Sequence, residues 1–255
     1  NLPIRVVAAP TRVDELVVPG QGFGLGEIIE GTFKYRQAIH SQFARDIKAA
    51  GPEKIYISRS KLGLRKGGLL GEELLEEFLA KEGYEIYHPQ EHSLSAQLSV
   101  YKAARQVIAA DGSALHLFAM VGQPDQRVAM ILRRHSTAHT LLTENVRHFC
   151  KSDPLVIGAL RTEWMPKDKQ RSSRLSFGEL NHAVIGQALH EGGFIVGGLD
   201  WPLLDKDARK QLLKDKGIKT RHFVEATPDP ERERIRAERQ ARRARRAARE
   251  AENQS

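Results

Sequence analysis

Residues 107–115, VIAADGSAL, decide the fold that this 255-residue sequence predicts. Four apolar residues come first, Asp111 and Gly112 break the run, and Ser113 opens a second apolar stretch. The pattern predicts a buried parallel strand, a tight turn whose glycine lets a ligand approach, and a helix with Ser113 as its N-cap. Open α/β sheets bind phosphorylated ligands at such turns. The stretch therefore predicts either a phosphate seat or a plain strand-to-helix turn.

On both sides of this stretch, from residue 54 onward, short apolar runs alternate with helical spacing. The predicted strands are 55–57, 84–87, 107–110 and 128–132, and the predicted helices are 71–82, 95–106 and 113–121. This alternation predicts the α/β class, with a Rossmann-like parallel sheet covered by helices on both faces.

The flanking segments give weaker patterns. Before residue 50 we expect strands at 4–9 and 13–18, a flexible glycine-rich crossing at 19–26 and a helix at 32–49. After residue 150 we expect strands at 155–160 and 194–196 and helices at 176–191 and 205–216. Ser176 and Glu179 stand in capping-box register at the start of the first of these helices.

Composition excludes several classes of protein. The mean hydropathy is −0.45, and the apolar runs are far shorter than the roughly 18 to 20 residues of a membrane span. The single cysteine, Cys150, excludes an internal disulfide and a multi-cysteine metal cluster, which fits a cytoplasmic protein.

The net charge of +8 is concentrated near the C-terminus, because residues 231–252 hold nine arginines and five glutamates, a balance of +4. This segment has no apolar stripe, so we expect residues 226–255 to form a basic tail, helical or disordered. It is either a solubilising extension or a contact with an anionic membrane surface or nucleic acid. No specific nucleic acid is predicted.

Polar residues follow three of the predicted strands, and parallel strands place their carboxyl ends on one rim. Arg59 and Arg65 offer forked, permanently charged donors for phosphate oxygens, and the turn at Gly112 and Ser113 adds backbone N–H groups for the same donor. Additional donor-binding candidates are Ser58, which adds a hydroxyl, and Glu91, Ser93 and Gln97, which suit ribose or sugar hydroxyls. The set predicts a site for a nucleoside diphosphate.

The same residues carry a family resemblance. The motifs are YISR at 56–59 followed by Arg65, GEE at 71–73, GYE at 83–85, PQEHSLSAQ at 89–97, AA at 103–104 and GSAL at 112–115. In order and spacing they resemble glycosyltransferase family 61, including its bacterial capsular polysaccharide members, over roughly residues 16–150. The resemblance implies a GT-B-like, inverting, metal-independent enzyme that takes a nucleotide-sugar donor and a saccharide acceptor. It also places Ala114 and Leu115 in the donor site.

In that family the C-terminal Rossmann-like half holds the donor. The resemblance therefore implies a remnant of the N-terminal half at 1–50, a donor-binding domain at 51–225 and the tail at 226–255. Many relatives have histidine where this chain has Asp111, and a carboxylate there would repel a diphosphate. Asp111 is thus expected to cap the following helix, or to face the sugar as catalytic base; otherwise the base lies in an N-terminal half upstream of Asn1.

Two alternatives stay open. His135, His139 and His148 invite a metal hypothesis, but no acidic residue stands in register with them, so we predict no metal ligand and no cofactor beyond the nucleotide-sugar co-substrate. The alternative function is a non-catalytic Rossmann-like binding module that uses its basic tail to hold nucleic acid or a membrane face.

Overall fold

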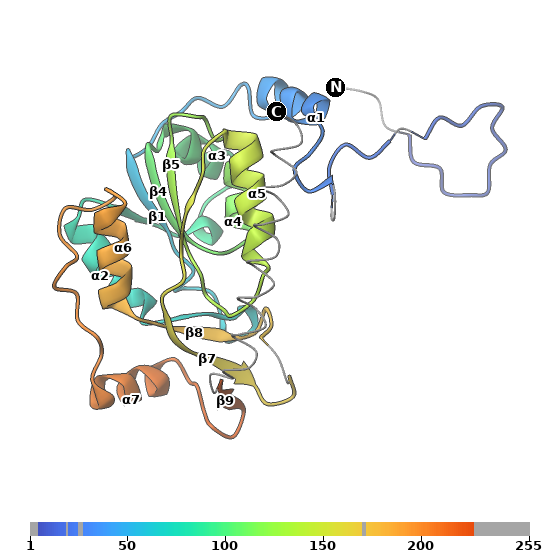
Figure 1. Cartoon of the computed structure of the whole chain (residues 1–255). Coiled ribbons are helices and arrows are strands. Elements are labelled where there is room, and N and C mark those ends of the chain that lie inside the picture. The colour runs from blue at the N-terminus through green and yellow to red at the C-terminus, as the bar shows by residue number, and fades with distance from the viewer. Residues whose placement is uncertain (1–4, 19, 25–27, 170–171, 227–255) are drawn as a thin grey trace, which may run out of the picture.

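The computed structural model describes residues 5–18, 20–24, 28–169 and 172–226. Its centre is a five-stranded sheet in the order β3-β1-β4-β5-β6, with every neighbouring pair parallel (Figure 1). The strands are β1 (Lys54–Ile57), β3 (Glu85–Tyr87), β4 (Gln106–Ala110), β5 (Arg127–Ile131) and β6 (Leu155–Ile157). The Rossmann-like α/β prediction is confirmed, and residues 107–110 lie in the central strand.

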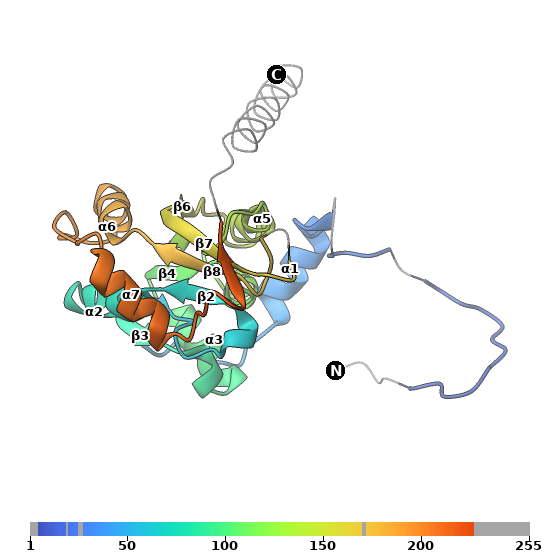
Figure 2. The ribbon, with the colours of Figure 1, turned by 90° about the horizontal axis from the view of Figure 1, so that it is seen from below.

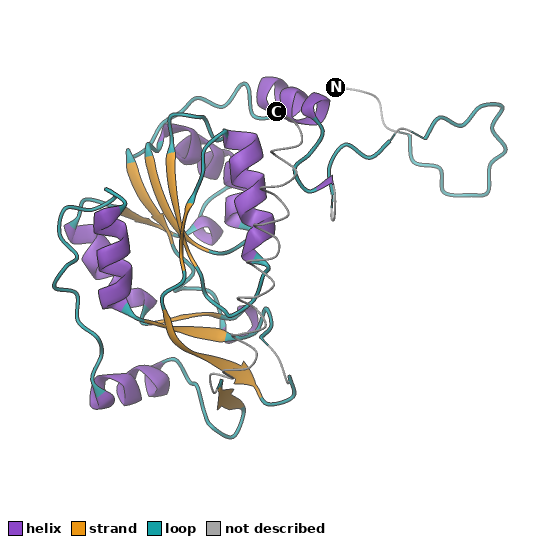
Figure 3. Cartoon of the chain, viewed as in Figure 1, coloured by secondary structure: helices purple, strands orange, loops and turns teal. Residues whose placement is uncertain are grey.

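Helices cover both faces of this sheet, as Figure 3 shows. One face packs against α3 (Leu94–Ala103), α4 (Ala114–Ala119) and α5 (His139–Cys150), and the other against α2 (Glu72–Lys81) and α6 (His182–Glu191). Ile55 and Ile57 belong to the first core and Tyr56 to the second. Because successive strand side chains point to opposite faces, burial of both faces explains why these strands are apolar at nearly every position.

A second sheet lies across the carboxyl ends of the first (Figures 1 and 2). Its order is β2-β8-β7-β9, made of β2 (Gly68–Leu70), β8 (Phe177–Leu180), β7 (Leu160–Pro166) and β9 (Phe223–Glu225). The outer face packs through Trp164 and Phe177 against the segment that carries α7 (Lys206–Asp215). On the inner face, a Cβ at Gly178 would lie 2.4 Å from the carbonyl oxygen of Arg133, so only glycine permits the two sheets to meet there.

This second sheet corrects the predicted helix at 176–191. Residues 177–180 form β8, and α6 begins after Asn181, whose side chain accepts the N–H of Val184 at 3.3 Å. Glu179 belongs to no capping box. It accepts the indole N–H of Trp164 at 3.1 Å and pairs with Arg209 at 2.6 Å, contacts with residues distant in the sequence that the local pattern does not reveal.

Other predicted elements are also corrected. No strand forms within 5–9 or 13–18, which are exposed throughout, and the predicted helix at 32–49 is limited to α1 (Phe33–Gln42). Residues 194–196 form no strand. The N–H groups of Val196 and Gly197 donate instead to the carboxylate of Glu82, both at 2.9 Å. The tail at 227–255, like parts of the 19–26 crossing, lies outside the described residues.

Candidate functional site

The strand order reverses between β1 and β4, and we refer to the carboxyl ends of these two strands as the crevice. After β1 the chain builds β3 on one side of that strand and then β4 on the other, and open α/β sheets bind ligands where the order reverses in this way. Arg59 follows β1 and Gly112 follows β4. A Cβ at Gly112 would lie only 3.0 Å from Nη1 of Arg59, so the structure brings these two predicted residues together.

Arg59 is fixed in place by its own backbone and side chain. Its N–H donates to Oε1 of Glu72 at 2.8 Å, and its Nη2 donates to the carbonyl of Lys66 at 3.2 Å. Its Nε is buried and has no hydrogen-bond partner among the described residues. A guanidinium held at one end with a donor unsatisfied suits an incoming anion. Arg65 lies on the 3-10 helix Leu64–Lys66 between β1 and β2, where it is exposed and makes no hydrogen bond within the described chain.

Glu72, at the start of α2, holds the loop after β1 through its hydrogen bond with the Arg59 N–H. Its side chain is buried, and Oε1 also accepts the hydroxyl of Tyr56 at 2.9 Å, while Oε2 has no partner among the described residues. Burial raises the pKa of Glu72 to about 7, against the hydrogen bonds from Arg59 and Tyr56 that lower it. The hydroxyl of Ser58 contacts Glu76 of α2 and lies 3.1 Å from Ser60, so it turns toward that helix and not into the crevice.

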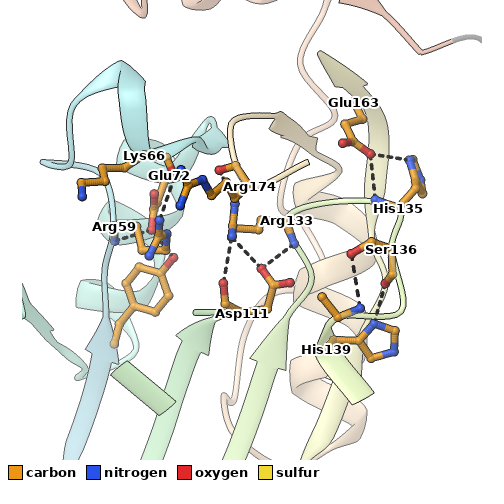
Figure 4. Close-up of polar contacts among 12 residues, drawn as sticks. Arg59, Lys66, Glu72, Asp111, Arg133, His135, Ser136, His139, Glu163 and Arg174 are labelled. Atoms are coloured by element: carbon orange, nitrogen blue, oxygen red, sulfur yellow. Dashed lines mark hydrogen bonds and ion pairs between the residues drawn. The ribbon is translucent and has the colours of Figure 1, made fainter. Parts of the chain in front are cut away.

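Asp111 does not cap the helix that follows it, and its carboxylate is paired with an arginine. Its Oδ1 lies 3.0 Å from Nε of Arg133 and accepts the Arg133 N–H at 3.3 Å, while the same Nε donates to the Asp111 carbonyl at 2.9 Å (Figure 4). Both side chains are nearly buried. Ser113 precedes α4 but makes no capping hydrogen bond with its side chain. The helix-cap prediction is wrong because an arginine from β5's end, remote in the sequence, takes the carboxylate.

The surroundings of this ion pair are positive. Burial, together with the neighbouring Arg59 and Arg134, lowers the pKa of Arg133 to about 10, although Asp111 opposes the shift. Burial also raises the pKa of Asp111, with Arg133 the strongest opposing influence. Nε of Arg134 is buried without a partner in the described part of the chain. Three arginines thus gather around Asp111, with the carboxylate of Glu163 also close to Arg133.

The remaining predicted donor ligands shape the loops around the crevice. Glu91 pairs with Lys61 at 3.0 Å, which links the loop after β3 to the loop after β1, and this hydrogen bond lowers the pKa of Glu91. Ser93 caps α3 by accepting the Ala96 N–H at 3.3 Å. Gln97 donates to the Pro89 carbonyl at 2.8 Å. Leu115 lies in the core and Ala114 packs against it, so their side chains line no crevice.

Sequence reasoning missed a histidine and carboxylate pair on the same rim. His135 follows β5, and Glu163 on β7 lies beside it; the pairing depends on β7, which was not predicted. The three histidines of the metal hypothesis are not brought together. His139 binds the Ser136 carbonyl at 2.9 Å, and His148 lies 3.2 Å from Glu144, with Glu30 completing an ion-pair cluster.

Two cavities lie at the other end of the large sheet, near the amino ends of its strands β5 and β6. The larger, of about 680 Å³, is lined by Arg147 and Asp153 among others, and the smaller, of about 390 Å³, shares Asp153. Arg147 is already paired with Glu144 and Asp153, so it offers no free charge. Arg36 and Lys151 also line the larger cavity and Arg127 the smaller; the carboxyl rim differs from both because it lies at the switch point of the sheet.

Two other features bear on ligands and membranes. The sequence contains one Asp-x-Asp, at Asp205 and Asp207, but Asp205 caps α7 by accepting the N–H of Asp207 at 2.9 Å and of Ala208 at 2.8 Å. It lies on the outer segment, away from the crevice.

Among the described residues, none of the helices combines the length and the hydropathy needed to cross a bilayer.

Comparison with known proteins gives one finding. Residues 4–129 match the family model described as Glycosyltransferase 61. The matched segment includes every predicted donor-binding residue as well as Asp111, and it ends within β5, before Arg133 and His135. No curated protein matches the chain. The match supports the resemblance to glycosyltransferase family 61 that the motifs indicated.

Proposed function

We propose that this chain transfers a sugar from a nucleotide-sugar donor to a saccharide acceptor, in the synthesis of capsular or other cell-surface polysaccharide. The observation that carries the proposal is the contact of Arg59 with Gly112 at the switch point of the sheet. There a fixed guanidinium meets a backbone without a side chain, within a segment that matches the glycosyltransferase model. Such a seat suits the diphosphate of the donor.

The arginines supply the charge that the reaction needs. When the bond between the sugar and the diphosphate breaks, negative charge develops on the leaving oxygen, and preorganised donors stabilise it. Arg59, Arg133 and Arg134 surround the crevice, and Asp111 neutralises part of one of them. In this proposal the reaction inverts the anomeric centre and needs no divalent metal, because guanidinium groups offset the diphosphate charge.

Binding of the bare diphosphate and turnover of the donor test the proposal separately. We expect UDP or GDP to bind the full chain in calorimetry, and one of a panel of UDP- and GDP-sugars to be hydrolysed or transferred. Gly112→Val should remove binding, because its side chain would meet Arg59 and fill the seat. Binding that survives this substitution, or a complete lack of turnover on the panel, would count against sugar transfer.

The tail completes the proposed setting, a cytoplasmic enzyme in peripheral contact with an anionic membrane. Deleting residues 229–255 should lower salt-sensitive attachment to phosphatidylserine vesicles, because the arginines of 231–252 are lost. Nucleotide affinity should stay the same. Equal vesicle binding by the truncated and full chains would remove the membrane from the proposal.

A further inference from the structure

A histidine backed by a buried carboxylate stands on the rim beside the arginine cluster. Oε2 of Glu163 accepts the backbone N–H of His135 at 2.8 Å and lies 3.4 Å from Nδ1 of the same residue (Figure 4). The side chain of Glu163 is 1% exposed, whereas that of His135 is 48% exposed. The carboxylate therefore holds one edge of the imidazole and leaves the other edge, with Nε2, open to solvent.

Glu163 is held as a charged group despite its burial. Burial raises its pKa, but the opposing influence of His135 and of the nearby Ser172 and Ser176 is larger, so the net shift is downward. A carboxylate facing Nδ1 favours the tautomer in which Nδ1 carries the proton. Nε2 is then an acceptor, which is the state of a general base.

Position also favours His135 over Asp111 for this role. His135 lies two residues after Arg133, whose side chain packs against Asp111 at the end of β4. Asp111 is buried and its Oδ1 is paired with Arg133, so it is less accessible to an acceptor sugar than the half-exposed His135. Glu163 lies on the face of β7 that looks toward the rim, because it pairs in register with Gly178, where an added Cβ would meet the Arg133 carbonyl.

We propose that His135 is the general base of the sugar transfer and that Glu163 is its positioning residue, an inference that rests on the proposed function. Nε2 of His135 takes the proton of the acceptor hydroxyl as that oxygen forms its bond to C1 of the donor sugar. The bond from C1 to the diphosphate oxygen breaks, and its electron pair leaves with the diphosphate at the arginine cluster. The imidazolium that results is stabilised by Glu163.

The kinetic test uses the full chain and the nucleotide sugar that the panel identifies. His135→Ala should lower kcat by about 100-fold or more, the usual scale for a general base, while the UDP or GDP dissociation constant stays within about twofold. Added imidazole should restore part of the rate, which a merely structural role would not allow. His139→Gln is the matched control, since His139 lies on the same segment without a carboxylate behind it, and its rate should be nearly unchanged.

Glu163 is tested by kinetics and by the state of the imidazole. Glu163→Gln should lower kcat with unchanged nucleotide affinity. Nitrogen-15 NMR of the unaltered protein should show His135 with its proton on Nδ1, and Glu163→Ala should shift the signal. A proton on Nε2, or a rate that survives His135→Ala, would overturn the base assignment. Absence of any turnover by the unaltered protein would overturn the proposed sugar transfer itself.

Discussion

The two sheets of this molecule are built differently and serve different ends. The large sheet is all parallel; its loops after β1 and β5 carry the arginines of the candidate site, and the loop after β4 carries Asp111 and Gly112. The small sheet is mixed and joins segments from residue 68 to residue 225. It supplies Glu163 behind His135, and the loop between β7 and β8 supplies the Arg174 carbonyl, 3.4 Å from Nη1 of Arg133. The comparison teaches that one sheet presents the charged groups and the other fixes their positions.

The largest effect on stability is expected from breaking the buried ion pair between Asp111 and Arg133 in the large sheet. Asp111→Ala should lower the free energy of unfolding by about 3–5 kcal/mol, because it leaves Arg133 buried without its partner. Urea denaturation measures this. Asp125→Ala is the control, since its pair with Arg105 is exposed and an exposed pair contributes at most about 1 kcal/mol. Equal costs for the two variants would show that the buried pair is not a stabilising element of the rim.

A smaller effect is expected in the pH dependence of the unfolding free energy, through the buried carboxyl group of Glu72. Below pH 4.5, the ordinary pKa of the group, Glu72 is protonated in both folded and unfolded chains. Between pH 4.5 and about 7 only the folded chain keeps the proton, so the stability that this group contributes falls as pH rises and stays low above pH 7.

Glu72→Gln should remove this decline, because the amide oxygen can still accept the Arg59 N–H. The loss of unfolding free energy between pH 5 and pH 8 should shrink by about 2–3 kcal/mol relative to the unaltered protein. Parallel urea curves at the two pH values give the comparison. An unchanged difference would mean that Glu72 is ionised across the whole range.

Arg59 is expected to contribute more than Arg65 to the binding of UDP or GDP. Arg59→Ala should weaken UDP or GDP binding by about 1.5–3 kcal/mol, the scale of a charged hydrogen bond, and Arg59→Lys should recover only part, because lysine cannot fork. Arg65→Ala should cost less, since Arg65 is exposed and has no contact that fixes it. Calorimetry that ranks Arg65 above Arg59 would move the seat to the 3-10 helix.

The sequence predicted the large sheet well and the small sheet hardly at all, for a physical reason. Strands β1, β4 and β5 are nearly continuous apolar runs buried on both faces, so their pattern is local and strong. The strands β2 and β9 have three residues each, and β8 is hidden in a segment that continues into α6. Their pairing depends on contacts that no local periodicity encodes.

The same division holds for the site. Arg59 and Gly112 were found because each follows a strongly patterned strand, and parallel strands share a rim. Asp111 was misjudged, and His135 was taken only as a metal candidate, because their partners, Arg133 and Glu163, come from elsewhere in the fold. The position of a residue on the rim is predictable from its strand. Its protonation and its hydrogen-bond partner depend on residues that come from other strands.

The smallest effect is expected from removing divalent metal. This test asks whether the arginines of the large sheet alone can offset the negative charge of the donor diphosphate. A nucleoside diphosphate brings a charge of about −2 or more to the end of β4, where Arg59, Arg133 and Arg134 lie around Asp111. The carboxylate is already committed to Arg133, so it is a poor ligand for a second cation. We therefore expect excess EDTA to leave UDP or GDP affinity and the transfer rate within about twofold. Recovery of a lost rate by added magnesium or manganese would refute this balance of charge, and Asp111→Asn would then show whether the ion binds at the end of β4.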